Sequence, residues 1–184
     1  MAGQFQQRRG RSRGGPSRER EVKEFEQKVL EVARVTRVTA GGKRMRFRVL
    51  AVIGDLKGRV GFAVAKGSDV SQAITKATTR AKKNLITIVT VNDTIPHAVT
   101  IKHGASRLIL KPAPRGTGII AGGVVRPIFE LSGVGNVVSK LLGTRNKINN
   151  VSATFKALQM LRTQSPSRAP RVKEAPEQAQ QQPQ

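Results

Sequence analysis

The chain has 184 residues, of which 34 are Lys or Arg and 11 are Asp or Glu, and its formal net charge is +23 at pH 7. A charge of this size indicates a polyanionic partner such as RNA, because each phosphate that a protein neutralises releases a condensed counterion. No apolar run approaches the roughly 20 residues that span a bilayer, and the amino terminus lacks the pattern of a secretory signal, so we expect a cytoplasmic protein with no membrane partner.

Both ends of the chain lack core-forming residues. Residues 1–20 are rich in Arg, Gly, Gln and Ser, with Phe5 as the one large apolar side chain after Met1, and residues 165–184 are rich in Pro, Gln, Ser and Ala. Segments of this composition bury too little apolar surface to offset the entropy of folding. We therefore expect disordered tails over residues 1–22 and 165–184, and two small domains between them, 23–88 and 89–164.

Three antiparallel strands are predicted in the first domain. Residues 44–53 are predicted to form a strand in which apolar side chains occupy every second position. The apolar positions are Met45, Phe47, Val49, Ala51 and Ile53. Arg44, Arg46 and Arg48 begin the other face of this strand. A preceding strand over residues 28–38 reaches this one through a glycine-containing loop, and a turn over residues 54–58 leads to a third strand, residues 59–65.

A helix is expected to follow the third strand and to cover the sheet. Ser68 or Asp69 can accept hydrogen bonds from its first amides. Apolar residues recur at helical spacing at Val70, Ala73, Ile74, Ala77, Ala81 and Leu85. Lys76, Arg80 and Lys83 fall on one arc beside this apolar stripe. Two interpretations of the arc stay open, an ordinary solvated face and a surface for RNA.

The second domain is also predicted to mix strands and helices. Strands are expected near residues 86–91, 97–102, 106–111 and 137–142. Helices are expected over residues 122–131, ended by Gly133, and over residues 150–161. The chain is therefore assigned to the α+β class, with two small domains and disordered tails.

A glycine-rich segment, residues 116–121 (GTGIIA), matches the dinucleotide pattern G-x-G-x-x-A. A dinucleotide site also needs an acidic residue about 20 positions further on, and no Asp or Glu occurs from Leu131 to Arg162. Two other interpretations remain. The glycines, flanked by Arg115 and Arg126, can let a phosphate of RNA approach backbone amides near a helix start, or they can form a tight turn.

Two polar segments are further candidates for RNA contact. At the first hairpin tip, two glycines leave the backbone accessible and two cations supply charge, whereas a plain flexible hairpin is the alternative. A polar cluster over residues 145–150 precedes the last helix, and helix capping by an Asn explains only part of it.

The predicted RNA-binding residues lie in these segments, in the second strand and in the first helix. They are Arg37, Gly41, Gly42, Lys43, Arg44, Arg46, Arg48, Lys76, Arg80, Lys83, Arg115, Gly116, Thr117, Gly118, Gly122, Gly123, Arg126, Arg145, Asn146, Lys147 and Asn149. No catalytic residue, cofactor or metal site is predicted. The chain has no Cys, and its two histidines, His97 and His103, have no acid near them in sequence, which favours a surface role over acid–base chemistry.

Two separated motifs resemble the hallmarks of one ribosomal family. The first runs from Gly42 and Lys43 through Phe47 and Val49 to residues 52–61 (VIGDLKGRVG). The second is residues 116–123 (GTGIIAGG). In this register, from about residue 25 to residue 161, the chain is similar to the fifth protein of the bacterial small ribosomal subunit.

The resemblance implies a first domain similar to the double-stranded-RNA-binding fold and a second domain with a left-handed β-α-β fold. It implies a structural, non-catalytic protein that binds small-subunit ribosomal RNA where the head meets the body and contributes to subunit assembly. The implied partners are the fourth and eighth proteins of that subunit and messenger RNA where it enters its channel, with an influence on decoding accuracy. Residues 41–44 resemble the family's arm near the spectinomycin-binding region, and Lys147 stands where many members have Pro.

Two functions from other classes compete with this one. A small-molecule kinase on the second-domain fold would need carboxylates for magnesium, of which that half offers Asp93 and Glu130. A free-standing regulator of duplex RNA would bind arbitrary duplexes. Ser68 and Asp69, however, stand where a typical double-stranded-RNA-binding domain has its lysine cluster. We therefore expect no small-molecule substrate and no generic duplex binding.

Overall fold

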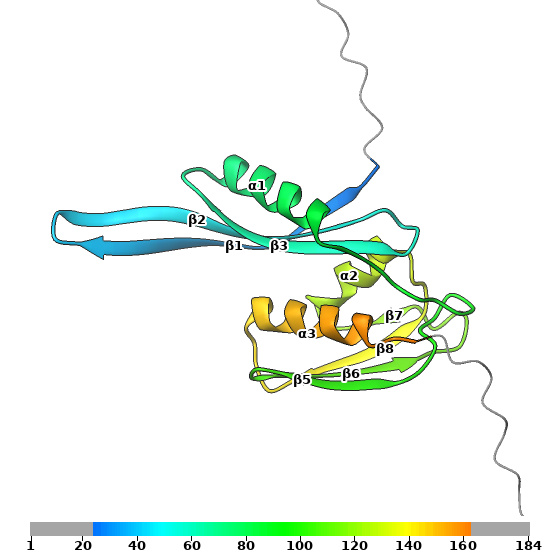
Figure 1. Cartoon of the computed structure of the whole chain (residues 1–184). Coiled ribbons are helices and arrows are strands. Elements are labelled where there is room, and N and C mark those ends of the chain that lie inside the picture. Colours follow the sequence, from blue (N-terminus) through cyan, green and yellow to red (C-terminus); the bar gives the residue numbers. More distant parts are fainter. Residues whose placement is uncertain (1–23, 163–184) are drawn as a thin grey trace, which may run out of the picture.

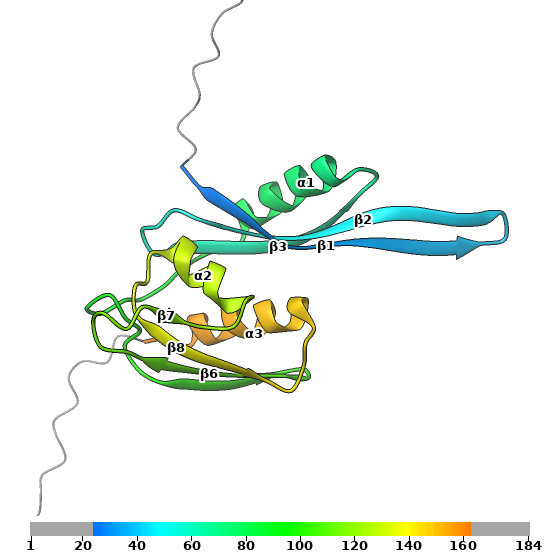
Figure 2. The same cartoon turned by 180° about the vertical axis from the view of Figure 1, so that it is seen from behind.

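The computed structural model describes residues 24–162, which form alternating layers of helix and sheet (Figure 1). Helix α1 covers one face of the first sheet, and helices α2 and α3 lie between that sheet and the second one (Figures 1 and 2). The predicted tails, residues 1–22 and 165–184, lie outside the described residues.

The first sheet is antiparallel, in the order β1-β2-β3-β4. Its elements are β1 (Glu26–Thr39), β2 (Gly42–Gly54), β3 (Arg59–Gly67) and β4 (Leu85–Thr87), with α1 (Val70–Lys83) between β3 and β4. The predicted β-β-β-α order is confirmed. One expectation was wrong: residues 86–91 do not form a strand of the second sheet, because Ile86 pairs with Val60 and places β4 in the first.

Strand β2 is central to the core because both of its faces are buried from Val49 onward. Val49 and Ala51 face α1 and pack against its small alanines. Leu50 and Val52 point the opposite way, as alternate strand residues must, and join a cluster with residues of α2, α3 and the second sheet. Both sheets therefore share one hydrophobic core.

The second sheet has the order β5-β6-β8-β7. Its elements are β5 (Val99–His103), β6 (Ser106–Pro112), β7 (Ile119–Ile120) and β8 (Val137–Leu142). β7 pairs in parallel with β8, and α2 (Val125–Ser132) connects them, which forms the β-α-β unit that the family resemblance implies. Helix α3 (Lys147–Gln159) contacts β5 and β6.

Both helices of the second half begin at other residues than predicted. α2 begins at Val125 rather than at residue 122, because the Gly122 carbonyl accepts hydrogen bonds from the amides of Val125 and Arg126 in a preceding turn. α3 begins at Lys147 rather than at residue 150, because Asn146 is its N-cap. Gly133 ends α2 in the left-handed conformation, as predicted.

A tight junction joins the turn after β2 to the end of α2. The Leu56 amide donates to the Leu131 carbonyl at 3.0 Å. A Cβ on Gly54 would lie 2.1 Å from the Leu131 carbonyl oxygen, and a Cβ on Gly133 would lie 2.3 Å from the Leu56 carbonyl oxygen. The two backbones thus meet at a distance that only glycine allows at both positions.

Asp55 holds the turn that enters this junction. Its side chain is 3 % exposed, and one carboxylate oxygen accepts the amides of Lys57 and Arg59 at 2.9 and 3.0 Å. The other accepts Nε of Arg59 at 2.6 Å. Burial acts to raise the pKa of Asp55, but these hydrogen bonds and the Arg59 charge outweigh it and hold the pKa below its ordinary value.

This lowered pKa predicts how Asp55 contributes to stability. A carboxylate with the lower pKa in the folded state stabilises the protein above its ordinary pKa, and that contribution is lost as the pH falls through the folded value. Asp55→Asn is therefore expected to lower the free energy of unfolding near neutral pH and to have a smaller effect in acid. Urea denaturation of both proteins at about pH 7 and about pH 3 measures this difference. An equal effect at both pH values would contradict it.

Candidate nucleic-acid interface

The β1–β2 hairpin extends past the rest of the sheet as a two-stranded arm, which we define as residues 34–47 (Figures 1 and 2). β3 ends at Gly67, opposite Phe47, so that only β1 and β2 continue beyond this pair. From Val32 to Gly54 the sequence contains six Lys or Arg and no Asp or Glu. The arm is therefore a projecting cationic ribbon.

Cations from three strands gather on one face of the arm and of the sheet next to it. The register pairs Arg37 with Arg44 and Arg48 with Lys66, and paired residues of an antiparallel sheet share a face. Arg46 lies between these pairs on the same face. We call these five residues, Arg37, Arg44, Arg46, Arg48 and Lys66, the basic face.

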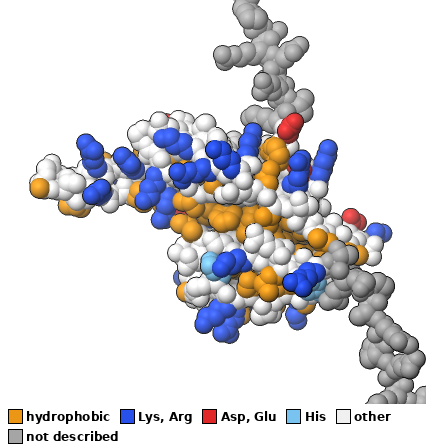
Figure 3. All heavy atoms as spheres, in the orientation of Figure 1, with side chains coloured by type: hydrophobic (Ala, Val, Ile, Leu, Met, Phe, Trp, Pro, Cys, Tyr) orange, Lys and Arg blue, Asp and Glu red, His pale blue; other side chains and the backbone are white. Residues whose placement is uncertain are grey.

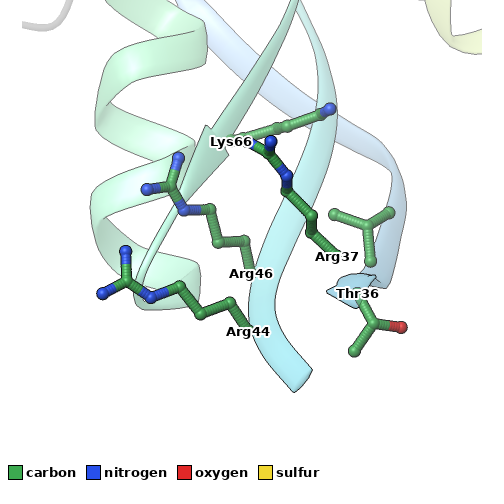
Figure 4. Close-up of a pocket in the computed structure, with 6 residues that line it drawn as sticks. Thr36, Arg37, Arg44, Arg46 and Lys66 are labelled. Carbon is green, nitrogen blue, oxygen red and sulfur yellow. The ribbon is translucent and has the colours of Figure 1, made fainter. Parts of the chain in front are cut away.

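An open cleft lies on the basic face. It has a volume of about 290 Å³ and is lined by Val35, Thr36, Arg37, Arg44, Arg46 and Lys66. Figure 4 shows Arg44 and Arg46 pointing to the same side of the arm, with Arg37 and Lys66 beside them. Lys66 is exposed and was not among the predicted RNA-binding residues. It could have been found only through the β2–β3 register.

The two glycines at the tip of the arm have free space where a side chain would stand. No atom lies within 4 Å of a Cβ placed on Gly41 or Gly42, and Gly42 has φ of +129°. Its carbonyl accepts the Thr39 hydroxyl at 3.0 Å. Gly42 is therefore required by the backbone conformation and not by a neighbour, and the cations that follow it, Lys43 and Arg44, are exposed.

The cations on α1 fall into two groups. Lys76 and Lys83 are exposed, whereas Arg80 donates to the Val64 carbonyl of β3 at 3.3 Å and so is partly engaged within the fold. Arg80 and Lys83 border a second cleft of about 450 Å³ beside Phe62. Figure 3 shows Lys and Arg side chains over α1 and along the arm. Lys76 and Lys83 are therefore better placed for a partner than Arg80.

In the glycine-rich segment, a side chain occupies the amides that a phosphate would use. Oδ1 of Asn136 accepts the amides of Gly116 and Gly118, each at 3.1 Å. The Gly118 carbonyl in turn accepts the Val137 amide. This arrangement favours the tight-turn interpretation of the segment. Thr117 lies within this segment, and Arg115, Gly122, Gly123 and Arg126 flank it in the sequence. Arg115 lies 3.8 Å from the exposed carboxylate of Asp93.

Asn136 should therefore be important for the shape of this turn. Asn136→Ala removes the acceptor of two amides and is expected to lower the free energy of unfolding by about 1–3 kcal/mol. Asn136→Asp keeps an acceptor oxygen, so we expect it to lower the free energy of unfolding by less than Asn136→Ala does. Denaturation curves, with hydrogen exchange at Gly116 and Gly118, measure the effect. If these two amides were equally protected in the alanine variant, the role given to Asn136 would be wrong.

The polar cluster over residues 145–150, which spans the start of α3, is partly engaged within the fold. Asn146 caps α3 by accepting the Ile148 amide at 3.1 Å. Asn150 is buried, accepts the Ser106 hydroxyl at 2.7 Å and donates to the Thr144 carbonyl at 3.2 Å. Arg145 is exposed, and Asn149 is half-buried. Capping thus accounts for Asn146 alone, and the buried Asn150 is held by hydrogen bonds within the fold.

Lys147 contacts the first sheet. Its Nζ donates a hydrogen bond to the Leu30 carbonyl at 3.4 Å. Leu30 is the extra residue of a β-bulge in β1, between Val29 and Glu31, and such a residue leaves the ladder locally interrupted. Lys147 therefore joins α3 to β1, which sequence spacing gave no means to foresee.

The structure brings some of the predicted residues together and separates others. The arm cations converge on one face, and the polar cluster lies on the same side of the molecule as the arm, whereas the glycine-rich segment lies at the opposite end (Figures 1 and 2). Among the described residues, no cluster of three or more His, Asp or Glu could hold a metal ion. In the same part of the chain, no helix is long and apolar enough to cross a membrane.

Comparison with known proteins identifies the family. A model described as the N-terminal domain of ribosomal protein S5 matches residues 25–89, and one described as its C-terminal domain matches residues 101–171. The chain belongs to the ribosomal protein S5 family. Membership makes it a structural ribosomal protein and not an enzyme.

Curated members of the S5 family match over most of their length. The small ribosomal subunit protein uS5 of Thermotoga neapolitana is 47% identical over 144 residues, which cover 78% of this chain and 81% of the relative. The uS5 protein of Thermotoga maritima is 44% identical over 147 residues, which cover 80% of this chain and 83% of the relative. That of Campylobacter jejuni is 48% identical over 139 residues, covering 76% and 95%. The resemblance to the fifth small-subunit protein is confirmed.

Residues of the two S5 motifs form turns that hold this fold together. Gly54 and Asp55 of the first motif form the junction turn against α2. Gly116 and Gly118 of the second form the turn held by Asn136. Gly42, at the start of the first motif, is the exception, because a Cβ placed on it would meet nothing within 4 Å and its side-chain partner is Thr39, within the same hairpin.

Proposed function

We propose that this chain binds small-subunit ribosomal RNA and that the basic face of the arm is its principal contact. The observation that carries the proposal is the convergence of Arg37, Arg44, Arg46 and Lys66 on one open cleft of an acid-free ribbon. A guanidinium donates two parallel hydrogen bonds to phosphate oxygens, which makes arginine well suited to an RNA backbone.

The ion pairs of the fold support this assignment. Among residues 24–162, the ion pairs join Glu130, Asp55 and Asp93 to Lys28, Arg59 and Arg115, and no arm cation takes part. Unpaired cations held on a rigid strand repel one another in the free protein. A polyanion relieves that repulsion and gains the free energy of counterion release.

The family resemblance supports the finer placement that we propose. The chain would lie at the junction of the head and body of the small subunit, contact the fourth and eighth proteins, and border the channel where messenger RNA enters. From there it would contribute to subunit assembly and to decoding accuracy. Lys76 and Lys83 on α1, with Arg115, Arg126 and Arg145, are exposed and available for further contacts.

Sedimentation of a tagged chain in cell lysate tests the proposal. The protein is expected to migrate with small subunits, and its affinity for purified small-subunit RNA should fall steeply with salt, with a slope of about −0.7 to −0.9 in log–log form per phosphate contact. A nearly salt-independent affinity would contradict RNA-backbone binding. Equal affinity for an unrelated RNA duplex would favour the free-standing regulator instead.

The absence of Cys allows a sharper localisation of the arm. Ala40→Cys places one thiol at the exposed tip, to which a reagent that cleaves nearby RNA can be attached. Cleavage confined to a few sites of the small-subunit RNA is the expected result. Val91→Cys, on an exposed loop of the second half, is the matched control and should cleave elsewhere. Identical cleavage from both positions would show that the arm has no defined RNA site.

A further inference from the structure

The arm has a second face, opposite the basic face, that exposes large apolar side chains. Val38 is 70 % exposed, Met45 is 58 % exposed and Val32 is 48 % exposed. The register places them together, because Val38 pairs with Lys43, Met45 with Thr36 and Val32 with Val49. We call Val32, Val38 and Met45 the apolar face. Figure 3 shows hydrophobic side chains at the far end of the arm, among its Lys and Arg.

Folding of the chain gives no reason for the apolar face. Val32 lies beside Val49, which α1 buries completely, but exposure increases from Val32 to Met45 and then to Val38, toward the tip. A two-stranded ribbon that only carried charge would be better hydrated with polar residues on both faces, since exposed apolar strand surface promotes aggregation. A partner outside the described fold would account for these exposed side chains.

Charge indicates what that partner is. No acid occurs from Val32 to Gly54, and the apolar side of the ribbon also carries cations, with Arg34 opposite Phe47 and Lys43 opposite Val38. A partner that covers Val38 and Met45 must therefore also be anionic. In RNA, the surfaces that combine negative charge with apolar area are the base faces and sugar edges next to phosphates. These surfaces become accessible where the base stack is interrupted.

We propose that the apolar face contacts bases of small-subunit ribosomal RNA at an interruption of the stack, while the basic face holds phosphates of the adjoining strand. The inference rests on the proposed RNA binding and adds a second mode of recognition to it. The phosphate contacts position the arm, and the apolar contacts select an RNA site whose bases are unstacked. Val38 and Met45 act as a wedge, as apolar side chains do in other nucleic-acid complexes.

Salt dependence distinguishes the two faces. Val38→Thr with Met45→Gln keeps shape and charge and removes apolar contact. This variant is expected to bind small-subunit RNA roughly 5- to 50-fold more weakly at every salt concentration, with an unchanged salt slope. Arg44→Gln with Arg46→Gln should instead reduce the slope. The matched control is Ile120→Thr with Met160→Gln, which changes the same chemistry at residues 53 % and 54 % exposed outside the arm. It should bind like wild type.

Base-specific chemical probing of the RNA completes the test. A small set of bases protected by wild type should become reactive with the Val38→Thr, Met45→Gln variant and stay protected with the control. If that variant kept wild-type affinity and wild-type base protection, the wedge would be wrong while RNA binding by the chain would stand. If the variant bound RNA normally but did not stay in assembled subunits, the partner of the apolar face would be a protein, and the wedge would again be wrong. If Arg44→Gln with Arg46→Gln left the slope unchanged, the proposed function itself would fail. Thermal unfolding of every variant is expected to match wild type, because the mutated side chains are exposed.

Discussion

Gly54→Ala is expected to lower the free energy of unfolding by about 3–5 kcal/mol, because the new methyl group would lie 2.1 Å from the Leu131 carbonyl oxygen. Relief requires movement of a backbone that is itself hydrogen-bonded to Leu56. Gly133→Ala should cost a similar amount, because its φ of +79° adds conformational strain to a contact of 2.3 Å. Both substitutions separate the turn after β2 from the end of α2.

Gly123→Ala is the matched control for these variants. It makes the same chemical change in a segment of the second S5 motif, but nothing lies within 4 Å of its Cβ position and its φ is not positive. Its stability should stay within about 0.5 kcal/mol of wild type. Urea denaturation of the three variants measures the difference. Because Gly54 and Gly133 act at one junction, the double variant should lose less than the sum of the single losses. If Gly54→Ala unfolded at the same urea concentration as Gly123→Ala, the junction would be far more compliant than its geometry indicates.

Replacement of three arginines of the basic face is expected to have the largest effect on RNA binding. Arg37→Gln, Arg44→Gln and Arg46→Gln together remove the guanidiniums that line the cleft. If each holds one phosphate, the log–log salt slope should decrease by about 2–3, and affinity at low salt should fall by roughly two to three orders of magnitude. Stability should be unchanged, because these side chains are exposed and make no ion pair.

A control with the same loss of charge separates placement from net charge. Lys102→Gln, Arg107→Gln and Lys140→Gln remove three exposed cations from the second sheet. This variant is expected to bind RNA with a slope closer to that of wild type. Filter binding at four or more salt concentrations gives both slopes. Equal losses for the two triple variants would mean that the protein binds RNA through its net charge and that the basic face has no special position.

The sequence by itself determined the features that depend on neighbours along the chain. The alternation of apolar and polar residues over 44–53 predicted β2 and the face that carries its arginines. The helical spacing of apolar residues from Val70 onward predicted α1, and Gly133 marked the end of α2. The charge of the chain and the two separated motifs were sufficient to indicate a ribosomal family, which the comparisons confirm. These signals are local because side-chain direction within one strand or helix follows a fixed period.

Only the tertiary structure decided the features that join distant segments. The β2–β3 register brought Lys66 beside Arg37 and Arg44, the loops of the second half brought Asn136 onto the amides of Gly116 and Gly118, and Lys147 met the bulge at Leu30. The physical reason is that a buried backbone amide or carbonyl needs a hydrogen-bond partner, but the residues next to it in the sequence do not specify which residue that partner is. The exposure of Val38 and Met45 is also a tertiary feature, because an apolar residue of a strand is buried only where another element covers it. Helix α1 begins beside the base of the arm and runs away from it, so that it does not cover the arm.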